Sequence, residues 1–254
     1  MSITKLAISI AAPLPKLESF ERYMFIGPHP DDIEIGAGAT AAKLVAAGKK
    51  VCFLICTDGR FGSVEIPPKE LVPLRQAEAC ASAAALGVED VRFLPFSDGG
   101  FYDFRELVSA IAREVGDFKP DVILAPDCCV TSECHIDHLN TGRAAAEIAY
   151  FAPYARLMAE HGAQSAPVKA LAYYMTAKAN RFVKTSAALL NKQLSAVFDC
   201  HKSQFPTGCG EGKAIALYLR LRSVDFGLRC LCAHAEGFRV LGVTQMHCLP
   251  EAGD

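Results

Sequence analysis

Two short clusters of histidine and acidic residues are the parts of this sequence best equipped for chemistry. The first reads His29-Pro30-Asp31-Asp32-Ile33-Glu34, and the second reads Glu133-Cys134-His135-Ile136-Asp137-His138. Imidazole nitrogens and carboxylate oxygens are common zinc ligands, and three protein ligands leave one coordination position open for water. The same residue types would also hold iron, cobalt or manganese, so zinc is ranked first among several metals. The two clusters together predict one shared metal site.

Each cluster is preceded by a predicted buried strand and followed by a predicted helix, as the spacing of apolar residues indicates. Pro28 and Pro30 restrict the backbone on both sides of His29, which stiffens the turn where the chemical groups are densest. Open α/β sheets bind their ligands at the carboxyl ends of the strands, so we expect the two clusters to meet at that edge. The strands are predicted at residues 23–26 and 121–125, and the helices at residues 36–45 and 139–149.

The rest of the chain continues this alternation of strands and helices. Near-continuous apolar strands separated by helices are typical of a parallel sheet that is covered on both faces. The sequence therefore predicts an α/β fold with a Rossmann-like, mostly parallel sheet, in a single domain over residues 1–254. Four aspartates that follow strands are expected to converge at the carboxyl edge: Asp31, Asp58, Asp98 and Asp127. Further strands are predicted at residues 50–56, 91–94 and 171–175, and further helices at residues 104–115, 186–200 and 212–230. Another helix is predicted to follow the proline-rich stretch at residues 66–68 and to end at residue 86.

The composition argues against several classes of partner. The formal net charge of −2 comes from interleaved signs, without the basic stripe that binds nucleic acid. We expect no membrane span, because no apolar run is long enough, and the run at residues 6–12 lacks the shape of a secretion signal. The eleven cysteines include no C-x-x-C pair. We expect reduced thiols in a cytoplasmic protein, with Cys52, Cys56, Cys230 and Cys232 as small core residues.

On these motifs the chain resembles the LmbE/PIG-L family of zinc-dependent N-deacetylases. That family carries H-P-D-D-x-E near its N-terminus and H-x-D-H in mid-chain, and both motifs occur here in that order. The resemblance covers roughly residues 23–239 and includes Arg75 with Glu78, Pro126 and the late segment 235–239. The chain departs from the family at Glu133, where an aspartate is usual, so no role is carried over to that residue.

The resemblance implies a role for each residue of the two clusters. One zinc ion per chain would be held by His29, Asp32 and His138. Asp31 would be the general base and His135 the general acid, with Asp137 orienting His135. For Arg75 and Asp98 two interpretations stay open: contacts with sugar hydroxyls, or a loop bond and a surface charge. Zinc lowers the pKa of bound water to about 7. A carboxylate can then take the water proton, and histidine titrates near neutrality, where it can give a proton to a leaving amine.

The implied reaction is removal of the N-acetyl group from an N-acetylglucosamine-type sugar or glycoconjugate. A related amidase that cuts a cysteinyl conjugate of an amino sugar is the alternative within this resemblance. The implied partner is a small N-acetylated sugar, and a homo-oligomer is compatible with the family.

Two interpretations from other classes stay open at this point. Gly36-x-Gly38-x-x-Ala41 opens a helix after a strand, and Asp58 follows about twenty residues later, which is the spacing of a dinucleotide-binding fingerprint. Residues 28–35 intervene between that strand and the glycines, however, and the second cluster would have no role. The other alternative is a metal-binding protein without catalysis.

Some polar residues have simpler structural interpretations. Asp58 would cap the turn at Gly59 rather than bind a ligand. Three histidines are expected to be ordinary surface or partly buried residues: His161, His201 and His247.

Overall fold

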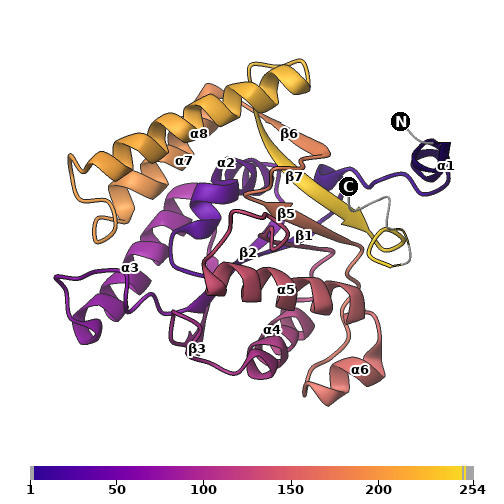
Figure 1. The fold of residues 1–254 in the computed structure, drawn as a ribbon, viewed down its shortest axis with the longest axis horizontal. Coiled ribbons are helices and arrows are strands. Elements are labelled where there is room, and N and C mark those ends of the chain that lie inside the picture. Colours follow the sequence, from indigo (N-terminus) through magenta and orange to yellow (C-terminus); the bar gives the residue numbers. More distant parts are fainter. Residues whose placement is uncertain (1–2, 248, 250–254) are drawn as a thin grey trace.

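A single sheet of seven strands runs through the centre of the protein (Figure 1). The structure is a computed structural model and describes residues 3–247 and 249. The strands lie in the order β3-β2-β1-β4-β5-β7-β6. Their bounds are β1 Arg22–Gly27, β2 Lys50–Thr57, β3 Asp90–Phe96, β4 Val122–Pro126, β5 Ala170–Tyr174, β6 Arg181–Thr185 and β7 His234–Gly242.

Strand β1 lies between β2 and β4 and is parallel to both. Strands β3 and β5 extend the parallel part on either side, and the predicted mostly parallel α/β fold is confirmed. After β3, the chain returns to the other side of β1 to form β4. The strand order therefore reverses between β1 and β4, and ligands of open α/β sheets bind outside the carboxyl ends of the strands at such a point.

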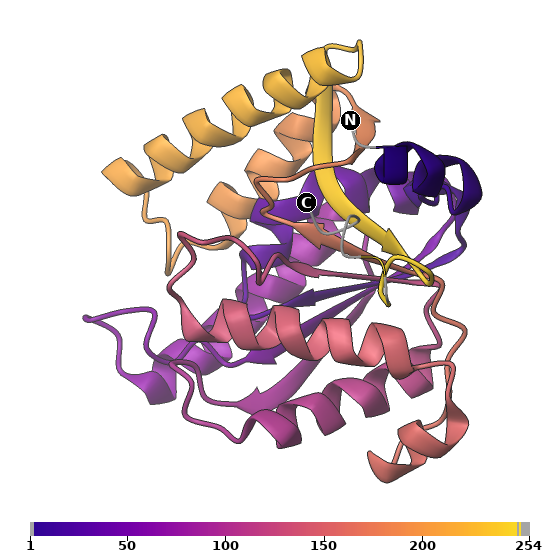
Figure 2. The same cartoon turned by 45° about the vertical axis from the view of Figure 1, so that its right-hand side comes forward.

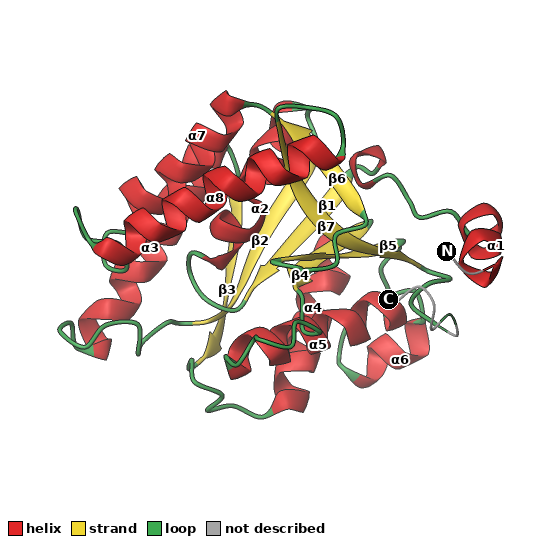
Figure 3. Cartoon of the chain, turned by 45° about the horizontal axis from the view of Figure 1, so that its top comes forward, coloured by secondary structure: helices red, strands yellow, loops and turns green. Residues whose placement is uncertain are grey.

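Helices cover both faces of the sheet (Figure 2, Figure 3). Alternate side chains of a strand point to opposite faces. Met24 and Ile26 of β1 accordingly belong to the core that includes α4 and α5, whereas Tyr23 and Phe25 belong to the core that includes α2 and α3. The helices are α1 Ile3–Ala11, α2 Asp32–Ala46, α3 Pro68–Leu86, α4 Phe104–Phe118, α5 Ile136–Phe151, α6 Ala155–Glu160, α7 Ala187–Ser195, with a π-helical turn at Ala196–Cys200, and α8 Gly210–Arg229.

The two helices that follow the clusters begin earlier than the sequence predicted. Helix α2 begins at Asp32, and α5 begins at Ile136 because His135 caps it by accepting a hydrogen bond from the backbone N–H of Asp137. The end of α3 lies where it was predicted, since Gly87 adopts φ +93°, a conformation that favours glycine. The cluster residues therefore lie on the first turns of helices or directly before them, and the sheet fixes the orientation of these helices.

The antiparallel edge of the sheet was not predicted. Strand β7 pairs antiparallel with both β5 and β6. Its apolar pattern is interrupted by Glu236 and Arg239, which are both buried and satisfied by polar partners. The prediction that Cys230 and Cys232 are core residues is wrong, because both lie partly exposed where α8 ends and β7 begins. Cys52 and Cys56 are buried in β2 as predicted.

The glycines of the dinucleotide-like pattern lie inside α2 rather than in the loop that follows β1. A Cβ atom on Gly36 would come within 2.2 Å of the Tyr174 ring, and one on Gly38 would come within 3.0 Å of the Gln193 side chain. These glycines thus serve close packing of α2 against β5 and α7, and they lie within the helix rather than in a phosphate-binding loop.

Within the described residues, no helix is both long and apolar enough to cross a membrane.

Candidate metal and catalytic site

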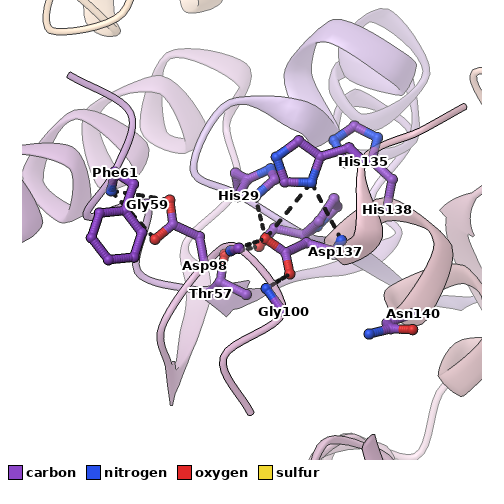
Figure 4. Close-up of polar contacts among 12 residues, drawn as sticks. His29, Thr57, Gly59, Phe61, Asp98, Gly100, His135, Asp137, His138 and Asn140 are labelled. Carbon is purple, nitrogen blue, oxygen red and sulfur yellow. Dashed lines mark hydrogen bonds and ion pairs between the residues drawn. The ribbon is translucent and has the colours of Figure 1, made fainter. Parts of the chain in front are cut away.

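The two clusters meet at the carboxyl ends of β1 and β4, as the sequence predicted (Figure 4). His29 Nδ1 lies 3.0 Å from Asp32 Oδ2, and His138 Nε2 lies 3.4 Å from Asp32 Oδ1. The three residues each offer one ligand atom, and these atoms lie within 4.8 Å of one another. Two imidazoles and one carboxylate at this spacing are a suitable ligand set for a zinc ion with an open position.

The outward nitrogen of each histidine faces another carboxylate. His29 Nε2 lies 3.0 Å from Asp137 Oδ2, and His138 Nδ1 lies 3.2 Å from Glu133 Oε2. Metal-binding histidines commonly donate their second nitrogen to a carboxylate, which fixes the ring and its tautomer. The surroundings of His29 thus fit a metal. At His138, Glu133 lies within ion-pair distance of Nδ1 but makes no hydrogen bond with it.

A second ligand set, His29 with His135 and Asp137, has the same spacing. The Asp137 carboxylate, however, already accepts hydrogen bonds from three further donors: the backbone N–H of Gly99 at 2.6 Å, the backbone N–H of Gly100 at 2.9 Å and the hydroxyl of Tyr102 at 2.9 Å. With His29 these donors occupy the roughly four acceptor positions of a carboxylate. The set with Asp32 and His138 is therefore the better metal site.

Asp137 contacts His29 more closely than His135, which it was predicted to orient. Its carboxylate oxygen Oδ2 lies 3.7 Å from His135 Nδ1, against 3.0 Å for His29 Nε2. Its backbone N–H donates to His135 Nδ1 at 3.3 Å, so the orientation of His135 is set by the backbone of α5.

Carboxylates surround the ring of His29. Burial alone would lower the pKa of His29, but hydrogen bonds to Asp137 and Asp32 outweigh burial and raise this pKa to about 10. The pKa of Asp137 is lowered to about 2 despite burial, chiefly by the hydrogen bond from His29. The carboxylates around His29 thus favour a positive charge at its position, and a divalent cation would supply it.

Asp31, the predicted general base, has a strained backbone and a charged partner. Its φ of 137° lies in a region that residues with a side chain rarely adopt. Arg75 Nη2 lies 3.2 Å from Asp31 Oδ2 and also donates to the Pro30 carbonyl at 2.8 Å. Burial raises the pKa of Asp31 to about 6, with Arg75 opposing that shift and Asp32 adding to it. A carboxylate with this pKa is charged at neutral pH and can accept a proton.

His135, the predicted general acid, is half-exposed, with 49% of its side chain accessible. Burial of the remainder and the nearby charge of His29 lower its pKa. Its ring lies 4.6 Å from the ring of His29, measured between centroids. His135 is therefore the histidine of the cluster that a bound substrate reaches most easily.

A buried polar layer supports the first cluster, and sequence reasoning missed one of its members. His201 is fully buried, which contradicts the prediction of a surface or partly buried histidine. Its Nε2 lies 3.3 Å from Glu34 Oε1, and Ser82 of α3 donates to the same oxygen. No motif surrounds His201 in the sequence, because its role depends on how the end of the π-helical turn packs beneath α2.

Of the four aspartates expected to converge, two line the site and two are engaged elsewhere. Asp31 and Asp98 line the same cleft as His29. Asp58 pairs with Arg60 and caps its own turn, as the simpler interpretation predicted. Asp127 is buried in an ion pair with Arg239, with Arg239 Nη2 2.6 Å from Asp127 Oδ1. That pair ties β7 to the end of β4.

The cleft has a volume of about 500 Å³, within the range of small-molecule sites. Arg75 and Asp98, the predicted substrate contacts, both line it. Each is almost fully buried and already hydrogen-bonded: Arg75 to the Gly59 carbonyl at 3.2 Å, and Asp98 to the backbone N–H of Phe61 at 3.1 Å. Both residues therefore hold the loops of the cleft in place, whatever they contact in a substrate.

The chain is similar to several known proteins. Residues 24–149 match the family PIG-L, described as GlcNAc-PI de-N-acetylase. The diacetylchitobiose deacetylase of Thermococcus kodakarensis is 32% identical over 255 residues, which cover 98% of this chain and 93% of that protein. The 1D-myo-inositol 2-acetamido-2-deoxy-alpha-D-glucopyranoside deacetylase of Kineococcus radiotolerans is 40% identical over 97 residues, 36% of this chain and 27% of that protein.

Among solved structures, the N,N'-diacetylchitobiose deacetylase from Pyrococcus horikoshii, complexed with its inhibitor MPG, matches with a TM-score of 0.86 and 27% identity. The match covers 98% of this chain and 97% of that one. The fold and the residues of the site thus define an LmbE-like deacetylase, a hydrolase that acts on N-acetyl amide bonds. The chain belongs to the PIG-L family.

Proposed function

We propose that this chain is a zinc-dependent deacetylase that removes the acetyl group from an N-acetylglucosamine-type sugar or glycoconjugate, with one zinc ion per chain. The observation that carries the proposal is the placement of His29, Asp32 and His138 around one point, with Asp31 and His135 beside it in the same cleft. Relatives named as deacetylases of N-acetylglucosamine-containing sugars support the choice of substrate.

Each residue of the site has a distinct task in this reaction. Zinc, when bound, supplies a water of lowered pKa and polarises the acyl carbonyl. Asp31 accepts the proton of the attacking water, and Arg75 holds its carboxylate in place. His135 donates a proton to the departing amine from the exposed side of the cluster. Asp137 and Glu133 fix the rings of His29 and His138.

The test is amine release from N-acetylglucosamine and from N,N'-diacetylchitobiose by the zinc-loaded protein, with metal content measured on the same sample. We expect hydrolysis of at least one sugar with about one zinc per chain, and Asp31→Asn serves as the inactive control. Zinc-loaded protein that releases no amine from either sugar would refute the proposed substrate class. Absence of bound metal after zinc loading would refute the metal site.

We further propose that the chain forms a homo-oligomer through α8, which lies on the outside of the fold (Figure 1). Exposed apolar residues lie along α8 and just beyond its C-terminal end. They are separated alternately by four and three positions, the spacing at which two helices pack against each other. Leu221 is 63% exposed and Leu228 is 71% exposed. The whole stripe is Leu217, Leu221, Val224, Leu228 and Leu231.

Light scattering after size-exclusion chromatography tests this assembly. We expect Leu221→Glu with Leu228→Glu to reduce the mass to that of a monomer, whereas Leu157→Glu, on the exposed surface of α6, leaves it unchanged. A wild-type mass equal to one chain would refute the assembly.

The cytoplasmic location is likewise a proposal, resting on the reduced thiols that the sequence predicts.

A further inference from the structure

Two exposed phenylalanine rings contact each other beside the catalytic cleft, and one of them, Phe61, lines it. Phe61, in the loop after β2, is 57% exposed, and Phe101, in the loop after β3, is 75% exposed. Their ring centroids are 6.1 Å apart, at an interplanar angle of 73°. Exposing large aromatic side chains to water is unfavourable in free energy. A pair of them beside a binding site commonly marks a surface that a ligand covers.

The loop that carries Phe61 is tied to the predicted catalytic base. The backbone N–H of Phe61 donates to Asp98, and Arg75 Nη1 donates to the carbonyl of Gly59. The same guanidinium contacts Asp31 through Nη2. A rigid set of contacts thus fixes the distance between the Phe61 ring and the reacting end of the cleft.

The loop that carries Phe101 is tied to the metal ligands in a similar way. The backbone N–H groups of Gly99 and Gly100 donate to Asp137, which in turn contacts His29. A Cβ atom on Gly99 would lie 3.1 Å from the Phe101 ring and 3.9 Å from the Phe61 ring. Glycine at this position therefore allows both rings to approach the same turn.

We propose that the Phe61 ring, with Phe101 packed edge-on against it, forms a stacking platform for a second sugar ring of the substrate, next to the ring that carries the acetyl group. This inference rests on the proposed function. A pyranose ring presents C–H bonds on its flat face, which pack on aromatic rings, and hydroxyls at its edge, which need polar partners. Asp98 lies beside Phe61 and, after accepting the Phe61 N–H, has further acceptor positions for hydroxyls.

The position of the platform assigns it to the second ring rather than the first. Asp98 lies between Phe61 and the histidine cluster, so the Phe61 ring lies at the end of the cleft that is remote from His29 (Figure 4). A substrate whose acetamide reaches His29 and His135 would extend its neighbouring sugar toward Phe61. The platform therefore favours disaccharides over N-acetylglucosamine alone.

The experiment compares kcat/KM for N,N'-diacetylchitobiose and for N-acetylglucosamine. In the double variant Phe61→Ala with Phe101→Ala, we expect the disaccharide to monosaccharide ratio to fall about tenfold, in keeping with the strength of aromatic contacts. The double variant Phe61→Tyr with Phe101→Tyr keeps the rings and should keep the ratio. Tyr154→Ala removes an exposed aromatic residue outside the cleft and is the matched control.

Calorimetric binding of the same disaccharide to Asp31→Asn protein, with and without the two Phe→Ala changes, separates this inference from the proposed function. Binding that depends on the rings, in a chain that hydrolyses neither sugar, would uphold the platform and refute the function. Hydrolysis with an unchanged ratio in the double Ala variant would uphold the function and refute the platform. Absence of both hydrolysis and binding would refute both.

Discussion

His29 Nε2 and Asp137 Oδ2 are 3.0 Å apart and join the first turn of α5 to the loop after β1. Asp137 is fully buried and is held in turn by the backbone of the loop after β3. One carboxylate thus connects three loops at the carboxyl edge of the sheet. In the proposed metal site, its task is to fix the ring of His29.

Replacing Asp137 with Asn should therefore weaken metal binding more than it disturbs the fold. Loss of such a carboxylate partner typically lowers metal affinity about 10–100-fold. The measurement is a zinc titration against a chelator, and Asp117→Asn, whose side chain is 73% exposed in a surface ion pair, is the control. Unchanged zinc affinity in Asp137→Asn would show that the contact with His29 has no part in metal binding.

Loss of the Glu133 carboxylate should weaken zinc binding through His138, as loss of the Asp137 carboxylate should through His29. Glu133→Ala removes the carboxylate 3.2 Å from His138 Nδ1, so we expect a loss of zinc affinity in the same direction and smaller, because Glu133 is more accessible than Asp137. Glu133→Asp tests whether the shorter side chain still reaches His138. If the alanine variant binds zinc as the wild type does, the contact with His138 is incidental.

Neighbouring aspartates of the first cluster should separate catalysis from metal binding. Asp31→Asn should retain zinc and lose turnover by about 10²–10⁴-fold, since an amide cannot accept the proton of water. Asp32→Asn should instead lose zinc, and His135→Ala should resemble Asp31→Asn. Turnover and zinc content are measured for all three proteins. Normal turnover in Asp31→Asn would exclude it as the base, and loss of its zinc would reverse the two assignments.

The buried Glu236 should make stability depend on pH. Burial raises its pKa from an ordinary value of 4.5 to about 7, although both carboxylate oxygens accept backbone N–H groups of Ala39 and Thr40. Between these two pH values the folded chain keeps a proton that the unfolded chain loses. The free energy of unfolding therefore falls as pH rises through this window, by on the order of 3 kcal/mol.

Glu236→Gln cannot titrate, so its free energy of unfolding should change less between pH 4.5 and pH 7 than that of the wild type. Denaturant unfolding at both pH values measures the difference, and Glu160→Gln at the exposed end of α6 is the control. Equal slopes in wild type and Glu236→Gln would show that Glu236 does not titrate in this window.

The sequence sufficed for the parallel strands of the sheet, which are β3, β2, β1, β4 and β5, and for the meeting of the two clusters at their carboxyl ends. Strands such as β1 and β2 are apolar on both faces, so each appears in the sequence as a continuous apolar run that predicts a buried strand. Strand β7 was not predicted, because it contains the charged residues Glu236 and Arg239. Their burial depends on polar partners in other elements, which no local pattern reveals.

His201 and the contact of Asp137 with His29 were missed for the same reason. His201 meets Glu34 across 167 positions of the chain, and Asp137 meets His29 across 108 positions. Residue types at these positions allow such contacts, but only the packing of helices on the sheet selects them. The assignment of ligands, base and acid, and of a single domain over residues 1–254, stays a prediction.

The switch point between β1 and β4 also determines when the metal site can form during folding. His29 and Asp32 follow β1, whereas His138 lies beyond β4, and β2 and β3 are formed by the chain between them. A partly folded chain without the β1–β4 pairing has only half of the ligand set. Zinc would therefore bind the native state alone, and at a free concentration 100 times its Kd it would stabilise that state by about 2.7 kcal/mol. Chelation would thus lower the melting temperature as well as the activity, and refolded chains would acquire their metal last.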